Sequence, residues 1–332
     1  MKAVGYKAPG APDILQDIEL PDPAPPTGRD LLVRVRAVSI NPVDTKIRQR
    51  AGALEGEAFR VLGWDAAGIV EAIGPDVRFF RPGDRVFYAG ALMRQGSNAE
   101  QQLVEETLVG HMPEGLDWGQ AASLPLTAVT AWEMLFDRLA VDHLTSGALL
   151  VVGGAGGVGS ILVQIARKLT SLTVIATASR PETRDWVQKM GAHHVVDHRG
   201  DIVAQIRALG FEHVTHIASL TASDRHQACY EEVLAPQGRL SLIDDPAQFD
   251  IMGFKRKSAV ISWEFMFTRS LFATPDRARQ HDILEQISSL VQAGDLVPTE
   301  YRRVTGLDAE TLTALHCESE SGTSIGKTVL VF

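Results

Sequence analysis

Hydrophobic and polar positions divide the chain into a part with the rhythm of short strands and a part in which strands alternate with helices. Before residue 110, apolar runs at 31–38, 68–73 and 84–88 are separated by prolines and glycines that mark turns. This pattern is typical of an antiparallel β-barrel. Further along, candidate strands lie at 148–152, 173–178, 194–197, 214–219, 238–243 and 258–262. Helical stretches separate most of them, which predicts a parallel sheet covered on both faces.

The remaining segments complete this division into domains. Residues 121–139 are rich in Ala and Leu and predict a helix, and 280–293 place their apolar side chains on one helical face. The tail returns to strand character at 301–304 and 327–332, so we expect it to rejoin the first domain. The prediction is an α/β protein in two domains. Residues 1–122 and 299–332 form the discontinuous β-barrel domain, and residues 123–298 form the doubly wound parallel-sheet domain.

A glycine-rich turn follows the strand at 148–152. Gly154, Gly156 and Gly159 fit the G-x-G-x-x-G spacing of a dinucleotide fold, and a helix-like pattern follows them. A backbone without side chains lets a pyrophosphate approach, and the amides at the helix start face the anion. A glycine-rich connection without a ligand is the alternative interpretation. Because strand, turn and helix stand in the required order, the sequence favours a dinucleotide site.

The end of the next strand indicates which nicotinamide cofactor binds. NAD-binding folds place an acidic residue there to hold the ribose 2′-hydroxyl, whereas this chain has Ser179 and Arg180. A hydroxyl and a guanidinium suit a 2′-phosphate, which an acid would repel. Ser179 and Glu182 also fit an S-x-x-E capping box, which needs no ligand. The missing acid favours NADPH.

Composition narrows the possible partners. The 332 residues are 45% hydrophobic, and 32 basic against 41 acidic residues give a net charge of −9. No basic stretch interrupts this balance, so we expect neither a nucleic-acid partner nor a membrane surface. The two cysteines, Cys229 and Cys317, form no C-x-x-C pair and suit a reducing compartment. With no signal-like or membrane-length apolar run, we expect a cytoplasmic protein.

Motifs along the whole chain carry a resemblance to a known superfamily. They lie at 39–44, 63–68, 81–86, 124–133, 153–159, 191–197, 263–269 and 326–329. In this order they resemble the medium-chain dehydrogenase/reductase superfamily. Within it, the chain looks like the zinc-free quinone oxidoreductase branch and the group labelled "zinc-type alcohol dehydrogenase-like".

The resemblance implies a GroES-like barrel, a Rossmann domain and a nicotinamide bound where the two meet. Asn41 would lie near the nicotinamide, and Leu220 and Ile243, at the ends of later strands, would border it and its ribose. The full set of implied cofactor-binding residues is Asn41, Thr130, Gly154, Gly156, Gly157, Val158, Gly159, Ser179, Arg180, His198, Leu220, Ile243 and Lys327. The superfamily also implies a homodimer, with residues 260–265 as a candidate edge.

The resemblance also bears on zinc. Zinc-dependent members carry Cys where Asn41 stands and a His–Glu pair where Trp64 and Asp65 stand. Amide and indole side chains are not zinc ligands. The four-cysteine structural lobe is absent as well, because no cysteine precedes Cys229. We therefore expect no metal.

Without a Lewis acid to stabilise an alkoxide, a simple alcohol is a poor substrate. The sequence therefore predicts hydride transfer from NADPH to a small-molecule acceptor, either a quinone or an α,β-unsaturated carbonyl. Asn41 and Tyr88 are the candidate catalytic residues. Asn41 is either an amide donor beside the nicotinamide or a turn residue, and Tyr88 is either a proton donor or a wall residue. Trp64 and Phe267 are candidates for the substrate pocket, although core packing explains them equally well.

Two other functions stay open. A non-catalytic NADPH-binding sensor or structural protein would keep the fold without turnover. A zinc-dependent alcohol dehydrogenase would require bound metal.

Overall fold

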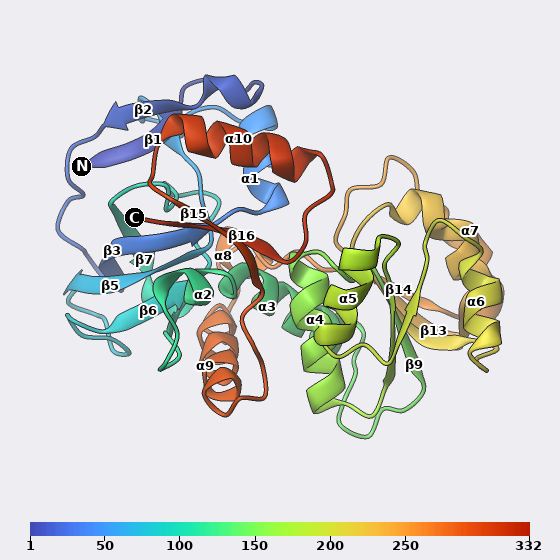
Figure 1. Ribbon diagram of the computed structural model, residues 1–332. Coiled ribbons are helices and arrows are strands. Elements are labelled where there is room, and N and C mark those ends of the chain that lie inside the picture. Colours follow the sequence, from blue (N-terminus) through green and yellow to red (C-terminus); the bar gives the residue numbers. More distant parts are fainter. The chain divides into compact units, whose positions relative to one another are not determined.

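Two units, each with its own core, make up the computed structural model, which describes residues 1–332 (Figure 1). The barrel unit consists of Met1–Val129 and Phe267–Phe332, and the Rossmann unit consists of Thr130–Met266. These boundaries differ from the predicted ones, because segments 123–129 and 267–298 lie in the barrel unit. Segment 267–298 is held to the barrel unit by hydrogen bonds. Gln280, on helix α9 (Arg279–Gln292), donates through Nε2 to the carbonyls of Ala89 at 2.7 Å and Leu108 at 3.1 Å.

The barrel unit is built mainly from antiparallel strands, as its turn-rich sequence predicts. Its strands are β1 Lys2–Tyr6, β2 Gln16–Glu19, β3 Asp30–Ser39, β4 Arg60–Val61, β5 Ala66–Ile73, β6 Arg85–Tyr88, β7 Gln101–Glu105, β8 Val109–His111, β15 Glu300–Thr305 and β16 Lys327–Val331. The order in the large sheet is β15-β16-β3-β5-β6-β8, with β7 also on β3, and a second sheet has the order β2-β1-β4. Strand β3 buries Leu31, Val33 and Val35 and turns the intervening residues outward, which is the two-residue period of a half-buried strand. The tail pairs antiparallel to β3 through β16, which joins the chain ends into one sheet.

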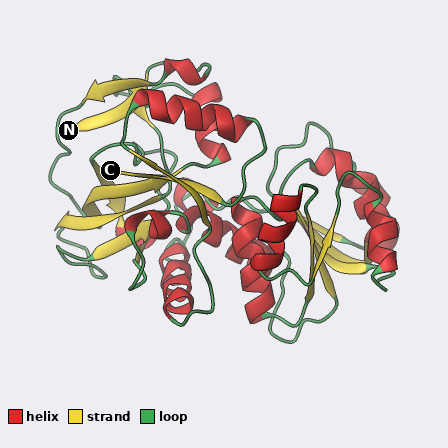
Figure 2. Ribbon diagram, viewed as in Figure 1, coloured by secondary structure: helices red, strands yellow, loops and turns green.

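Helices and helical turns complete the barrel unit (Figure 2). They are η1 Pro12–Ile14, α1 Pro42–Arg50, η2 Glu106–Leu108, α2 Trp118–Ala122, α8 Thr268–Leu271, α9 and α10 Ala309–Glu320, with α3 Pro125–Trp132 running on into the Rossmann unit. The single helix predicted for 121–139 is wrong. The structure has α2, α3 and a π-helix, η3 Glu133–Arg138, in succession. Pro125 opens α3, in keeping with the preference of proline for the first helical turn.

The Rossmann unit holds six parallel strands. They are β9 Ala148–Val152, β10 Thr173–Thr177, β11 His194–Val196, β12 Val214–Ser219, β13 Leu234–Leu242 and β14 Val260–Trp263. Their order, β11-β10-β9-β12-β13-β14, is the 3-2-1-4-5-6 order of the dinucleotide-binding fold. The order reverses at β9. Ligands in such sheets bind beyond the carboxyl ends of the strands at this reversal, which is where the glycine turn begins.

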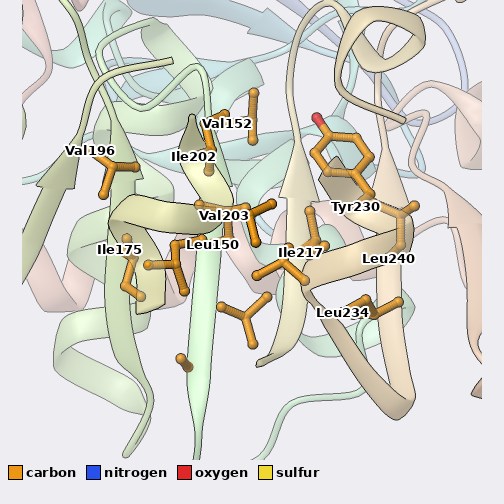
Figure 3. Packing of buried hydrophobic residues seen from close by; sticks show 14 of the residues in the cluster. Leu150, Val152, Ile175, Val196, Ile202, Val203, Ile217, Tyr230, Leu234 and Leu240 are labelled. Carbon is orange, nitrogen blue, oxygen red and sulfur yellow. The ribbon is translucent and has the colours of Figure 1, made fainter. Parts of the chain in front are cut away.

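Helices cover both faces of this sheet. They are α4 Gly157–Leu169, α5 Pro181–Lys189, α6 Ile202–Ala208 and α7 Ser223–Val233, with η4 Ile251–Lys257 before the last strand. Figure 1 shows α4 and α5 on one face and α6 and α7 on the other. Under α6 and α7, Leu150, Ile217 and Leu240 from three neighbouring strands pack with Val203 and Tyr230 (Figure 3). Because β9 is covered on both sides, all five of its residues are buried, which explains its continuous apolar run.

No helix of the structure combines the length and the apolar character that crossing a membrane requires.

Candidate cofactor and active site

The glycine turn leaves β9 with a left-handed residue, Gly153, at φ +86°. The Gly153 amide donates to the Thr177 hydroxyl at 3.0 Å, and the Gly156 amide donates to the Gly153 carbonyl at 3.2 Å. Helix α4 then begins at Gly157, so Gly157 and Val158 supply two of the amides that a helix leaves without an internal acceptor. This geometry suits a diphosphate.

The three fingerprint glycines have different steric roles. A Cβ on Gly159 would lie 2.5 Å from the Gly153 carbonyl oxygen, and one on Gly154 would lie 2.9 Å from the Cβ of Ala176. A Cβ on Gly156 would meet only the Gly153 oxygen, at 3.6 Å. The fold therefore needs glycine at 154 and 159 for close packing. At Gly156 the protein itself leaves room for a Cβ, so packing within the fold does not require glycine there.

The residues predicted to recognise the 2′-phosphate lie immediately after β10. Helix α5 begins at Pro181, and the hydroxyl of Thr183 caps it: Arg180 N donates to Thr183 Oγ1 at 3.1 Å, and that hydroxyl donates to the Arg180 carbonyl at 2.7 Å. The Ser179–Glu182 capping box is therefore wrong, because proline at the first helical position shifts the cap by one residue. Ser179 is not needed as a cap. Arg180 is 38% exposed at its side chain and lies 3.3 Å from Glu182.

A second arginine, which the sequence analysis missed, joins this strand end. Arg199 donates to the Ser179 carbonyl at 2.7 Å and forms an ion pair with Asp197 at 3.0 Å. The neighbouring His198, from the predicted cofactor set, has a pKa lowered by burial, with Arg199 and Arg180 acting in the same direction. The sequence signal was available, because Arg199 follows the third strand of the sheet just as Arg180 follows the second.

Leu220 and Ile243 follow the next two strand ends. The Leu220 amide donates to the Val152 carbonyl at 3.1 Å, and the Ile243 amide donates to the Ser219 carbonyl at 3.2 Å. Both therefore stand at the same edge of the sheet as the glycine turn. Thr130, the remaining predicted residue of this unit, lies buried in α3.

Asn41 and Lys327 lie together in a buried polar cluster of the barrel unit. The Asn41 amide nitrogen Nδ2 donates to Asp65 Oδ2 at 3.0 Å and to the Ser39 carbonyl at 3.3 Å, and its Oδ1 accepts from Lys327 Nζ. Its backbone amide donates to Asp44 Oδ2 at 2.7 Å, as expected at the start of helix α1. The Asn41 side chain is thus fully engaged within the protein. This favours the turn interpretation over an amide donor to substrate.

Burial shifts the pKa values of the ionisable groups in this cluster. Burial raises the pKa of Asp44 to about 7, against the lowering effect of the Asn41 hydrogen bond, and burial lowers the pKa of Lys327, against the effect of Asp65. Asp65 lies 3.1 Å from Lys327 Nζ and also accepts the Leu126 amide at 2.9 Å. An ammonium and a carboxylate therefore form a buried pair that also binds polar backbone groups.

The residues at the expected zinc positions do not fit zinc. Asn41 and Asp65 are bonded to an ammonium, and Trp64 donates through Nε1 to the Ala91 carbonyl at 3.1 Å. The Trp64 ring meets Phe267 edge to face, with centroids 6.2 Å apart. Trp64 and Phe267 are 0% and 2% exposed, so within this unit they are core residues.

Tyr88, the other candidate catalytic residue, is fully buried in the barrel unit. Its hydroxyl donates to Gln102 Oε1 at 2.8 Å, and burial raises its pKa above the ordinary value. Tyr88 is poorly suited to donate a proton to substrate, because its hydroxyl is buried and already donates to Gln102. The structure therefore disfavours the proton-donor interpretation of Tyr88.

A pair of buried carboxyls in the Rossmann unit was also missed. Glu264 follows β14, and Arg138 donates to it through Nε at 2.9 Å. Burial, and then the nearby Glu133 at the start of the π-helix, raise the pKa of Glu264 to about 9. Through Arg138, the last residue of the π-helix, Glu264 holds this helix to the end of β14.

Comparison with known proteins identifies the class that this fold and turn define. The family described as alcohol dehydrogenase GroES-like domain matches residues 27–130, and the family described as zinc-binding dehydrogenase matches residues 157–280. The chain is an oxidoreductase of the medium-chain dehydrogenase/reductase superfamily. Within the superfamily it belongs to the zinc-type alcohol dehydrogenase-like group, because it is 41% identical to a protein of that name from Staphylococcus aureus, over 99% of both chains.

Solved structures agree on the fold. A Rhizobium etli protein described as a zinc-dependent alcohol dehydrogenase is 53% identical and superposes with a TM-score of 0.97, covering 100% of this chain and 98% of its own. The quinone oxidoreductase of Escherichia coli, described in complex with NADPH, has a TM-score of 0.82 over 100% of both chains. At 21% identity it shows the fold alone. The predicted α/β architecture and superfamily are confirmed.

Proposed function

We propose that the protein is an NADPH-dependent reductase that delivers hydride to a quinone or an α,β-unsaturated carbonyl without metal. The observation that carries the proposal is the edge of the parallel sheet at its reversal point. A glycine turn with accessible amides follows β9, and Ser179 and Arg180, with no acid, follow β10.

The protein's own groups have defined tasks in this proposal. The amides of Gly157 and Val158 bind the diphosphate beside the bare backbone of Gly156, and the cations after β10 bind the 2′-phosphate. Leu220 and Ile243 border the nicotinamide half. The bound nicotinamide supplies a hydride to the conjugated acceptor, whose negative charge delocalises as an enolate or hydroquinone anion.

Solvent supplies the proton that completes the reduction. Tyr88, the candidate proton donor within the chain, is committed to Gln102, and the Asn41 amide is bonded to Asp65 and Lys327. Positioning and exclusion of water are therefore the main catalytic contributions of the chain.

The same observation supports a second candidate function. A protein that binds NADPH but has no side chain free to give a proton to substrate is compatible with a sensor or structural role. The two functions differ in turnover alone.

A panel of quinones and enones tests turnover. We expect NADPH oxidation, followed at its absorbance band, with at least one conjugated acceptor and none with simple ketones or aldehydes. The reason is that Asn41, Trp64 and Asp65, at the expected zinc positions, are bonded to protein groups, so a metal-stabilised alkoxide has no ligands there. Tight NADPH binding by calorimetry with no oxidation across the panel would favour the non-catalytic function.

We also propose a homodimer formed through β14, which lies at the edge of the Rossmann sheet. Val260, Trp263 and Phe265 are exposed there by 41%, 51% and 45%, and an open apolar edge is a template for pairing with another chain. A second copy presents the same edge, so the contact is self-complementary.

Charges on this edge should separate the subunits. We expect sedimentation to give twice the chain mass of 36.0 kDa for the wild type and a single chain mass for Val260→Lys/Trp263→Lys. Met93→Lys is the matched control, because Met93 is 66% exposed in the barrel unit. A wild-type protein that sediments as a single chain contradicts the dimer.

A further inference from the structure

Lys327 carries an ammonium in the interior of the barrel unit, where its side chain is 2% exposed. Its Nζ contacts three oxygens: the Ile40 carbonyl at 2.7 Å, Asn41 Oδ1 at 2.5 Å and Asp65 Oδ2 at 3.1 Å. An ammonium has three N–H donors, so each has an acceptor. Three protein oxygens therefore surround the Lys327 ammonium, as oxygen ligands surround a bound metal cation.

The oxygens around this cation belong to segments far apart in the chain. Asn41 starts α1, Asp65 precedes β5, and Lys327 opens β16. Asp65 extends the connection further, because it accepts the Ser39 hydroxyl at 2.7 Å and the Leu126 amide of α3 at 2.9 Å. One buried charge pair thus joins β3, α1, β5, α3 and β16.

The superfamily resemblance implies that zinc-dependent members carry Cys at the position of Asn41 and Glu at that of Asp65, with His at a third position, that of Trp64. Here both bind the Lys327 ammonium, while the third, Trp64, bonds to the Ala91 carbonyl instead. In this chain the Asn41 amide and the Asp65 carboxylate both bind an amine, so neither is free to bind a metal.

We propose that Lys327 is a positioning residue whose ammonium replaces a metal cation as the charge that organises this cluster. It neutralises Asp65 and fixes the Asn41 amide, so the barrel unit assembles these segments without an exogenous ion. The relevance of Lys327 to catalysis rests on the proposed metal-independent reductase function. The tests of its ammonium measure stability and metal content, and they need neither an acceptor nor turnover.

The first test removes the cation and then its counter-charge. We expect Lys327→Met to lower the unfolding midpoint by roughly 10 °C, because Asp65 is left as a buried unpaired carboxylate. Asp65→Asn/Lys327→Met removes both charges and should recover more than half of that loss. Lys2→Met is the matched control, since Lys2 is exposed in the same unit. Additive losses in the double variant would overturn the proposal.

The second test supplies a free cation. In Lys327→Ala, n-propylammonium should raise the unfolding midpoint, or the yield of folded protein if the variant does not fold alone, whereas n-propanol should not. Neither compound should stabilise the wild type in this way. Equal effects of the amine and the alcohol would show that only volume matters and would refute the cation role.

Metal content of the wild-type protein completes the test. We expect no stoichiometric zinc after purification without chelator, and no shift of the unfolding midpoint with EDTA or with added zinc. Stoichiometric zinc together with a midpoint lowered by EDTA would overturn the replacement. Failure of the acceptor panel alone would leave these three results intact, so the two proposals fail separately.

Discussion

Gly156→Val should abolish cofactor binding while leaving the protein folded. The backbone at Gly156 has φ −73° and ψ 178°, which any residue adopts, and a Cβ would meet only the Gly153 oxygen at 3.6 Å. The valine methyls would instead occupy the space through which a diphosphate reaches the amides at the start of α4. Losing about two charge-assisted hydrogen bonds, at roughly 1.5 kcal/mol or more each, weakens binding about 100-fold or more.

Gly159→Val separates this ligand effect from a folding effect. Its Cβ would lie 2.5 Å from the Gly153 oxygen and 2.6 Å from the Gly154 oxygen, so helix α4 has to move away from the turn. We expect Gly159→Val to lower the unfolding midpoint and Gly156→Val to leave it close to that of the wild type. Calorimetry measures the affinity for NADPH. An unchanged affinity in Gly156→Val would show that the turn is structural only.

The features that the sequence predicted well depend on short-range patterns. The run 148–152 is apolar because β9 is covered on both faces, and the glycines that follow have spacing fixed by the turn itself. Strand β13 was less well predicted, since it starts at Leu234 rather than at 238. Its early part contains a proline and a residue at positive φ, Gln237, which obscured the pattern.

The features that the sequence did not predict depend on partners far along the chain. Lys327 and Asn41 are 286 residues apart, and Arg138 and Glu264 are 126 apart, so no local spacing reveals either contact. The motif around Asn41 identified the right region but not the state of the side chain. Whether an amide is free or engaged is decided by what packs against it, and here that is the C-terminal strand. The same holds for Tyr88, whose hydroxyl bonds to Gln102 on β7.

Arg180→Ala should change cofactor preference more than any other substitution of an exposed charge. NADPH and NADH differ by the 2′-phosphate, and Arg180 stands at the strand end where that phosphate would lie, with its helix capped independently by Thr183. A charge-assisted hydrogen bond of about 1.5–3 kcal/mol corresponds to a rise of roughly 10- to 100-fold in KM for NADPH, with little change for NADH. Steady-state kinetics with each cofactor measures the two effects.

Three further arginine variants separate the charge effect from other causes. Arg199→Ala should have a smaller effect, because Asp197 already neutralises that cation at 3.0 Å. Arg184→Ala should mainly reduce stability, since its guanidinium donates to the Ala178 and Val195 carbonyls at 3.3 and 3.2 Å. Arg207→Ala, which removes an exposed arginine paired with Glu232, is the control for net charge and should leave both KM values unchanged.

Replacing Ser179 and Arg180 so that an acid follows β10 should reverse the cofactor preference. Ser179→Asp/Arg180→Ala places a carboxylate at the end of β10, where it would accept a hydrogen bond from a ribose 2′-hydroxyl and repel a 2′-phosphate. We expect this variant to prefer NADH. Equal losses for the two cofactors, in this variant or in Arg180→Ala, would mean that this strand end does not contact the 2′ position, and the choice of NADPH would then lose its physical basis.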